Sequence, residues 1–193
     1  MFDLISKRQS KNPPLFVATL AFVVLSLTFF PLLVLVVDIA VKNNEQHLTE
    51  IVVTRSEKIL MVETKGISSS LGDWSSWNDT YQFAQNENRD YITNNLMDNT
   101  FSNLDINTMI ILNSEGEIIF EKYVDSVTQQ IKPSPIDNAE LIKEYPELIV
   151  RDGQSGVEGF VSHQGSIMIA ASKPILTSLD EGPSSGTMIF LKV

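Results

Sequence analysis

The sequence predicts an α+β fold. A transmembrane helix continues into a long helix, and an antiparallel five-stranded sheet with helices packed on it follows. Three observations favour this fold. The run from Leu15 to Val37 is 23 residues long and carries no charge. Residues 38–71 contain no proline and show apolar residues at alternating spacings of four and three. The C-terminal half contains β-branched runs on either side of glycine-containing loops.

The apolar run from Leu15 to Val37 is long enough to cross a bilayer. At 1.5 Å per residue a helix of this length spans roughly 35 Å, against a hydrocarbon core of about 30 Å. The basic residues Lys7, Arg8 and Lys11 precede the run, so the positive-inside rule places the N-terminus in the cytoplasm and the rest of the chain outside. The run exceeds the apolar core of a cleaved signal peptide, which is about 7–15 residues. We therefore expect an uncleaved, single-pass anchor in the cell membrane.

The composition excludes several kinds of site. Residues 42–193 carry 11 basic and 22 acidic side chains, a formal charge of −11, which disfavours nucleic acid as a partner. The chain has no cysteine, so disulfides, cysteine-ligated metals and thiol nucleophiles are excluded. Its two histidines, His47 and His163, are too far apart in sequence to suggest a multi-histidine metal site. We expect no metal and no cofactor.

Residues 38–71 are expected to form a long membrane-proximal helix. Their apolar stripe includes Val41, Leu48, Val52 and Ile59 but is interrupted at Glu45 and Arg55. One interpretation is a single helix that continues from the membrane and packs partly on the following domain. The other is the seam of a parallel homodimer. The two are compatible if the proximal half dimerises and the distal half packs.

An aromatic cluster follows this helix. Trp74, Trp77 and Tyr81 are spaced three and four apart, so on one helix they would share a face. Large aromatic residues at this spacing most often belong to a hydrophobic core. They can also form the wall of a ligand pocket, and the spacing alone does not separate the two interpretations.

The remaining elements alternate between helix and strand. The pattern predicts a helix over residues 90–104, a hairpin of residues 106–112 and 117–123, and a short helix after an N-cap at Asp137. A second hairpin is expected from residues 156–161 and 166–172, and a final strand covers residues 187–193. The connections are short or contain one helix, which favours an antiparallel sheet with helices on it.

Several of these segments resemble the type-four CHASE domain, an extracytoplasmic sensor family with a PAS-like, Cache-type fold. The resemblance covers roughly residues 45–193. It rests on the aromatic signature with Asp79 and Phe83, on Asn94-Asn95-Leu96, on Leu104-Asp105-Ile106-Asn107 leading into the first hairpin turn, on Ala170 to Ile175, and on Gly182 to Gly186.

The resemblance implies a sensory role. Such domains usually lie between two membrane helices in sensor histidine kinases of two-component systems or in diguanylate cyclases, where ligand binding outside alters the enzyme inside. Residues 1–14 would then be cytoplasmic, 15–37 transmembrane, 38–71 the membrane-proximal helix and 72–193 the PAS-like sensor core. The ligand would be a small molecule of unknown identity. Its expected contacts are Trp74, Trp77, Asp79, Tyr81 and Asn107.

No catalytic arrangement is evident in the sequence. The serines of residues 68–70 and 75–76 lack a glycine elbow, and His163 has no evident nucleophile beside it. We also find no kinase or cyclase region, no second membrane helix and no catalytic module in these 193 residues. The chain is expected to be a fragment of a receptor, a truncated product or a stand-alone anchored sensor. The alternative function is a membrane-anchored interaction or dimerisation module without a small-molecule ligand.

Overall fold

The computed structural model describes residues 13–193, which divide into two compact units between Glu57 and Lys58. The expected cytoplasmic segment 1–14, with Lys7, Arg8 and Lys11, therefore lies almost entirely outside the described residues. The first unit consists of the N-terminal part of α1. The second contains the end of α1 and all other elements, and the two units are described separately below.

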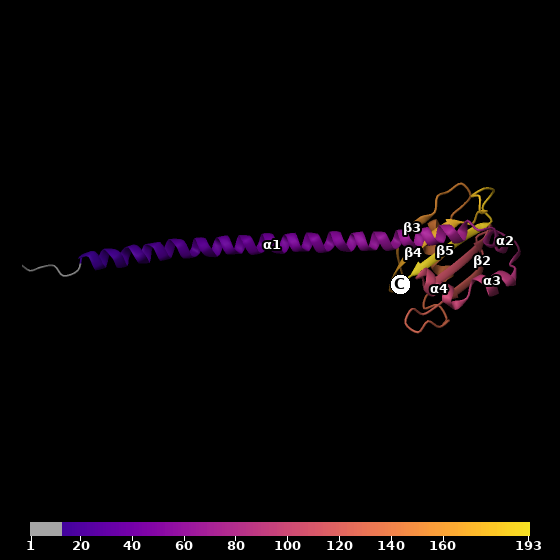
Figure 1. Ribbon diagram of the computed structural model, residues 1–193, viewed down its shortest axis with the longest axis horizontal. Coiled ribbons are helices and arrows are strands. Elements are labelled where there is room, and N and C mark those ends of the chain that lie inside the picture. Colours follow the sequence, from indigo (N-terminus) through magenta and orange to yellow (C-terminus); the bar gives the residue numbers. More distant parts are fainter. Residues whose placement is uncertain (1–12) are drawn as a thin grey trace, which may run out of the picture. The chain divides into compact units, whose positions relative to one another are not determined.

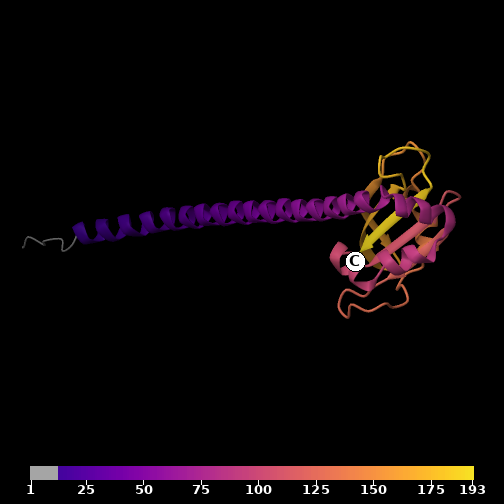
Figure 2. The same cartoon turned by 45° about the vertical axis from the view of Figure 1, so that its right-hand side comes forward.

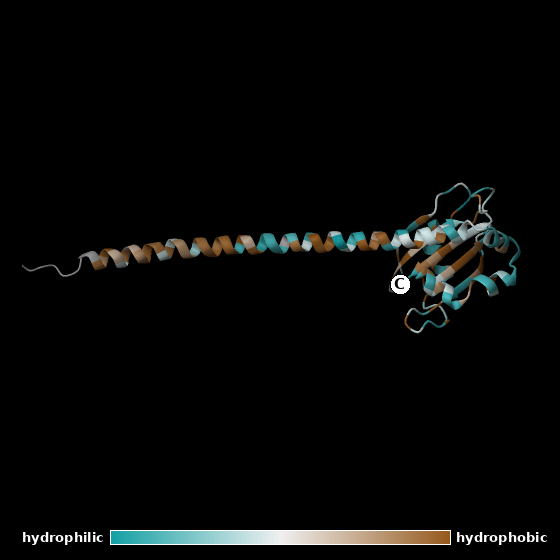
Figure 3. Cartoon of the chain, in the orientation of Figure 1, coloured by the Kyte–Doolittle hydropathy of each residue, from teal (hydrophilic) through white to brown (hydrophobic). Residues whose placement is uncertain are grey.

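Helix α1 runs from Pro13 to Ser75 and includes Pro31 in its interior. From Leu15 onward it is long and apolar enough to cross a membrane, and it is the one such helix among the described residues. Figure 3 shows the apolar colouring of its N-terminal part giving way to mixed colouring further along. The apolar side chains of residues 15–37 are exposed, as a lipid-facing helix requires.

Helix α1 ends later than the apolar pattern suggested. Its end falls between Trp74 and Trp77, so the two tryptophans do not belong to one helix. Trp74 lies in the last turn of α1, whereas Trp77 has an extended backbone (φ −126°, ψ 131°) and precedes α2 (Asn78–Asn86). The expectation that Trp74, Trp77 and Tyr81 share one face of a single helix is therefore wrong. The chain turns between Ser75 and Asn78, and tertiary packing brings the rings together instead.

The helix expected over residues 90–104 is likewise two helices, α3 (Arg89–Asn95) and α4 (Asp98–Leu104). The break at Leu96 and Met97 frees backbone carbonyl groups, and side chains satisfy them. The Thr100 hydroxyl donates to the Asn95 carbonyl at 2.8 Å, and Lys122 donates to the Leu96 carbonyl at 2.8 Å. Of these two donors, Thr100 belongs to α4 and Lys122 to strand β2, so the break is stabilised from both the next helix and the sheet.

The sheet agrees with the predicted fold class. Its strands are β1 (Thr108–Asn113), β2 (Ile118–Tyr123), β3 (Val157–His163), β4 (Ser166–Pro174) and β5 (Gly186–Lys192). They pair antiparallel in the order β2-β1-β5-β4-β3 (Figure 1). Both predicted hairpins and the final strand are present. So is the short helix α5 (Asn138–Glu144), whose N-cap Asp137 accepts hydrogen bonds from the backbone amides of Ala139 and Glu140.

Two hydrophobic clusters lie on opposite faces of the sheet, because neighbouring strand residues point to opposite sides. On the face we call the helix face, Met109 and Ile111 of β1 belong to a cluster with residues from α1, α2, α3 and α4. On the face we call the α5 face, Ile110 and Leu112 pack with α5 and the 3₁₀ helix Pro146–Leu148. Figures 1 and 2 show the C-terminal end of α1 running across the sheet.

Candidate functional site: a groove beside strand β2

The predicted aromatic residues form a packed cluster on the helix face. The Trp74 and Trp77 rings meet edge to face with centroids 5.8 Å apart, and Trp77 lies 6.3 Å from Tyr91. Phe83 stacks on Tyr91 at 4.8 Å and meets Phe120 edge to face at 6.4 Å. Aromatic pairs in these geometries add about 0.5–1.5 kcal/mol each beyond area burial. The cluster therefore has the properties of a stabilising core.

Asp79 lies at the edge of this cluster. It lines a cavity of about 180 Å³ together with Tyr91 and residues of α3. The Tyr91 hydroxyl is hydrogen-bonded to Thr80 at 2.7 Å, inside the core. Burial, countered by the Thr80 hydrogen bond and assisted by the negative charge of Asp79, raises the pKa of Tyr91 to about 12. A cavity of this size is below the range of about 300–1,000 Å³ typical of ligand pockets.

The two other predicted contacts make structural hydrogen bonds. The Tyr81 hydroxyl donates to the Pro183 carbonyl at 3.2 Å. Asn107 is buried at the start of β1, where its amide donates to the Val124 carbonyl and its oxygen accepts from the Val193 amide at 2.8 Å. Asn107 also lines a separate cavity of about 150 Å³. The structure thus brings Trp74, Trp77 and Asp79 into one region and leaves Asn107 in another. The assignment of these residues as ligand contacts stays a prediction.

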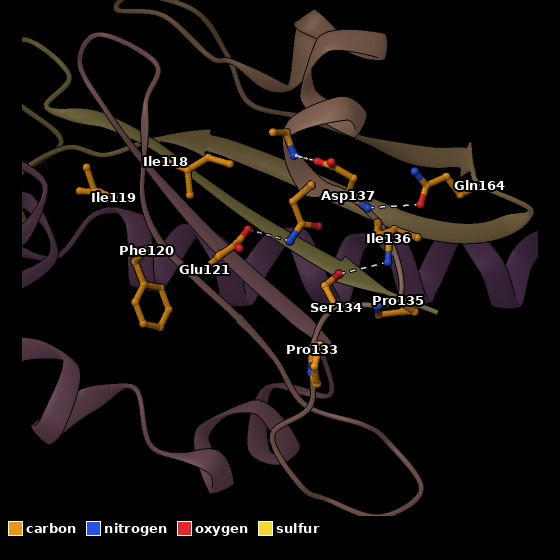
Figure 4. Close-up of a pocket in the computed structure, with 12 residues that line it drawn as sticks. Ile118, Ile119, Phe120, Glu121, Pro133, Ser134, Pro135, Ile136, Asp137 and Gln164 are labelled. Atoms are coloured by element: carbon orange, nitrogen blue, oxygen red, sulfur yellow. Dashed lines mark hydrogen bonds between the residues drawn. The ribbon is translucent and has the colours of Figure 1, made fainter.

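A larger cavity lies beside β2. It is an open groove of about 850 Å³, lined by residues 118–121 of β2, residues 133–139 and Gln164 of the β3–β4 turn. Figure 4 shows Ile118 and Glu121 along the strand, opposite the chain from Pro133 to Asp137. We call this cavity the β2 groove. Its volume lies within the range of small-molecule pockets.

A β-bulge in β2 determines which side chains of this strand face the groove. The pairing of β1 with β2 passes from Ile111 opposite Phe120 directly to Leu112 opposite Ile118, which leaves Ile119 as the extra residue. In a regular strand, residues three apart point to opposite faces. The bulge instead places Ile118 and Glu121 on the same side of the sheet, because their partners Leu112 and Ile110 both belong to the α5-face cluster. An apolar side chain and a carboxylate thus line one wall.

The opposite wall provides a buried amide. Asn138, the first residue of α5, is 4% exposed, and its Nδ2 atom donates to Glu121 Oε2 at 3.1 Å. Its Oδ1 atom is buried and has no hydrogen-bond partner among residues 13–193. A buried acceptor without a donor costs about 1–3 kcal/mol. Such an atom at a groove marks a position where a bound donor would be stabilising.

Polar contacts hold α5 over the sheet beside the groove. Tyr145 Oη donates to the Ser162 carbonyl at 3.0 Å and accepts from the Ser162 amide. His163 Nδ1 lies 2.6 Å from a Glu144 oxygen. Gln164 contacts both the backbone amide of Asp137 and the carboxylate of Glu140. These hydrogen bonds fix the wall of the groove to the β3–β4 hairpin in addition to the packing of Leu141 and Ile142 in the α5-face cluster.

Sequence reasoning did not identify the groove residues Glu121, Asn138 and Gln164. One signal did point to the segment, since Pro133, Pro135 and Asp137 mark an irregular chain that ends in a helix cap. The bulge at Ile119 has no comparable signal, because a run of β-branched and aromatic residues is equally compatible with a regular strand. The partner register alone decides which side chains face the groove.

Comparison with known proteins identifies the family of the C-terminal unit. Residues 59–193 match the CHASE4 domain. The Methanogenesis regulatory histidine kinase FilI of Methanothrix harundinacea is 32% identical over 130 residues, which cover 67% of this chain. The chain spans about 15% of the length of that relative.

Two solved structures share the fold. The extracellular domain assigned to the histidine kinase vpHK1S-Z8 superposes with a TM-score of 0.52 at 14% identity, covering 72% of this chain and 54% of that chain. A domain assigned to a sensory box/GGDEF family protein of Vibrio parahaemolyticus superposes with the same TM-score and identity, covering 57% of its own chain. At this identity the likeness concerns the fold alone.

Proposed function

The chain belongs to the CHASE4 domain family, and we propose that it is the extracytoplasmic input domain of a membrane receptor that binds a small molecule in the β2 groove. Relatives that contain or resemble this domain include a histidine kinase and a sensory box/GGDEF family protein. In this proposal the chain receives the signal, and an effector of one of these kinds produces the response. The role of these residues is reception and not catalysis.

The β2 groove carries the proposal. It combines an adequate volume, apolar side chains at Ile118, Pro133 and Pro135, and polar groups at Glu121 and Asn138. Ligand pockets are mostly apolar with a few polar groups that fix orientation. The aromatic cluster on the helix face borders the much smaller cavity of about 180 Å³ beside Asp79.

A variant that fills the groove tests ligand binding. Ala139 lines the groove and is exposed, so Ala139→Trp should fill the space without disturbing the core. Lys143→Trp adds the same side chain to α5 at an exposed position outside the groove lining and serves as the matched control. We expect soluble fragments of mixed charge to bind the full chain and the Lys143→Trp variant in ligand-observed NMR, but not Ala139→Trp. Equal binding to all three proteins, or binding to none, contradicts the proposed site.

The proposed topology is single-pass, with residues 42–193 outside the cell membrane. It is supported by the apolar α1 segment and by the basic residues Lys7, Arg8 and Lys11 on one side of it. Protease added to intact cells should degrade the C-terminal domain and spare the first residues. Protection of the domain together with cleavage near the N-terminus would reverse the orientation.

We also propose that the membrane-proximal part of α1 mediates a homodimer. Apolar residues of its stripe are exposed, with Val41 50%, Leu48 53% and Val52 62% exposed. A helix with such a stripe is stabilised by a second copy that covers it. Single cysteines placed from Asn44 to Leu48 should cross-link with helical periodicity, which the cysteine-free chain makes easy to read. Cross-linking without any ligand binding would favour the second candidate, an anchored dimerisation module.

A further inference from the structure

We infer that the β2 groove selects a cationic ligand, an ammonium group attached to an apolar body, over neutral and anionic molecules of the same shape. This inference rests on the proposed function of the groove and adds the chemical class of the ligand. Three features support it. The groove is lined by hydrogen-bond acceptors, the nearby lysines form ion pairs outside the groove, and apolar side chains lie between the acceptors.

The polar atoms available in the groove are mainly acceptors. The buried Oδ1 atom of Asn138 has no donor among the described residues. Among residues 13–193, Glu121 accepts a hydrogen bond from the Asn138 amide alone, so its second carboxylate oxygen is available for a ligand. Ser134 Oγ accepts from the backbone amide of Ile136, which leaves its hydroxyl hydrogen as a donor. A bound molecule that brings several N–H donors would satisfy the oxygens of Asn138 and Glu121, whereas a carboxylate would place further acceptors beside them.

The lining contains the carboxylates of Glu121 and Asp137 and no lysine or arginine. The two lysines nearest in sequence are engaged away from it. Lys122 points to the helix face, where its Nζ atom contacts Asp98 Oδ1 at 2.7 Å and lies 5.4 Å from the Phe101 ring centroid. Lys132 pairs with Asp125 at 2.8 Å.

These two contacts leave the negative charge of Glu121 without a cationic partner among the ion pairs of residues 13–193. Because Asp125 holds Lys132, that lysine is not free to neutralise the groove. The hydrogen bond from Lys132 and those from Thr128 lower the pKa of Asp125, which keeps the pair charged down to acidic pH. An ammonium ligand would be the missing partner of Glu121, with a charge-assisted hydrogen bond as the contact.

The walls between these polar groups suit an apolar body. Ile118 is half-buried in β2, and Pro133, Pro135 and Ile136 lie across the groove (Figure 4). A bare inorganic cation would leave these side chains uncovered, and among the described residues no cluster of three or more acidic or histidine side chains suits a metal ion. An organic ammonium covers both kinds of surface.

Three probes with one body separate charge from shape: 2-phenylethylammonium, 2-phenylethanol and 3-phenylpropionate. Their binding to the full chain in detergent is measured by ligand-observed NMR titration at fixed salt. We expect the ammonium to bind at least tenfold more tightly than the carboxylate, with the alcohol between them. Glu121→Gln should remove most of this preference. Glu158→Gln, which neutralises an exposed carboxylate on β3 outside the groove lining, should retain it.

The possible outcomes distinguish the two proposals. Binding of the alcohol or the carboxylate as tight as that of the ammonium, blocked by Ala139→Trp, overturns the charge preference and leaves the groove as the sensing site. A preference for the ammonium that persists in Glu121→Gln also overturns the inference, because it would reflect the net negative charge of the chain. Failure of all three probes to bind, together with failure of the mixed fragments, overturns the sensing site itself.

Discussion

The two faces of the sheet differ in how completely they are filled. On the helix face, segments from α1, α2, α3 and α4 cover the strands, and Phe83, Tyr91 and Trp77 interlock beneath them. On the α5 face a short helix and a 3₁₀ turn cover the middle of the sheet and leave the β2 groove open beside them. The helix face, which has the recognisable aromatic pattern in the sequence, is therefore the more completely packed one. The α5 face has no such pattern in the sequence, and it contains the open groove and the Asn138 oxygen, unpaired within residues 13–193, on which the binding proposal rests.

The largest expected effect is the loss of a core aromatic on the helix face. Phe83 is 1% exposed, so Phe83→Ala should lower the free energy of unfolding by about 3–5 kcal/mol. Ile118→Ala on the groove wall removes a half-buried side chain and should cost only about 1 kcal/mol. Thermal unfolding of the full chain and both variants measures the difference. Similar losses at the two positions would contradict the contrast between the faces.

Alkaline pH should act on the helix face through Tyr91. Its pKa is about 12 in the folded protein, against 10.0 for the free phenol. The neutral phenol is favoured by folding, so its stabilisation is complete below pH 10 and is lost as the pH rises from 10 to 12. The loss corresponds to about 2–3 kcal/mol. Chemical denaturation across this pH range measures it.

Tyr91→Phe is the control for the alkaline loss, since it should remove the contribution of Tyr91 and leave that of Lys192. Partial burial lowers the pKa of Lys192, but hydrogen bonds to Asp105 and Glu63 raise it by more. The remaining pH dependence in Tyr91→Phe therefore reports groups such as Lys192. An unchanged alkaline loss in this variant would show that Tyr91 does not cause it.

Trp77 tests whether the aromatic cluster is only a core. Its side chain is half-buried and packs on Trp74 and Tyr91, so Trp77→Ala should cost about 2 kcal/mol. Fragment binding to the β2 groove should be unchanged, because Trp77 belongs to the opposite face. An unchanged melting temperature combined with lost binding would instead move Trp77 from the core into a ligand pocket.

The smallest expected effect on stability is at Asn138. Asn138→Leu removes a buried acceptor without a donor and adds apolar contact, so the free energy of unfolding should change by less than about 1 kcal/mol, in the stabilising direction. Binding of 2-phenylethylammonium should nevertheless be lost. Parallel melting and titration experiments separate the two effects. A large loss of stability would show that the Asn138–Glu121 contact supports the fold more than it prepares a site.

The sequence by itself determined the elements and the family. The uncharged run from Leu15 to Val37 predicts a membrane-competent helix, and α1 has that length and composition. The β-branched runs around Asn113–Gly116 and Ser162–Gly165 predict two hairpins, and both are present. These features follow from local pattern, because periodicity, turn residues and caps act over a few neighbouring residues.

Only the tertiary structure decided where the chain breaks and which side chains meet. The turn between Ser75 and Asn78 places Trp74 in α1 and Trp77 outside it, and the break at Leu96 divides α3 from α4. The bulge at Ile119 brings Ile118 to the same side of the sheet as Glu121, whose carboxylate meets Asn138, 17 residues away in sequence. Each of these outcomes depends on a partner from a distant segment, which supplies the hydrogen bonds or the register. The local sequence pattern does not identify this distant partner, so the groove could not be predicted from the sequence.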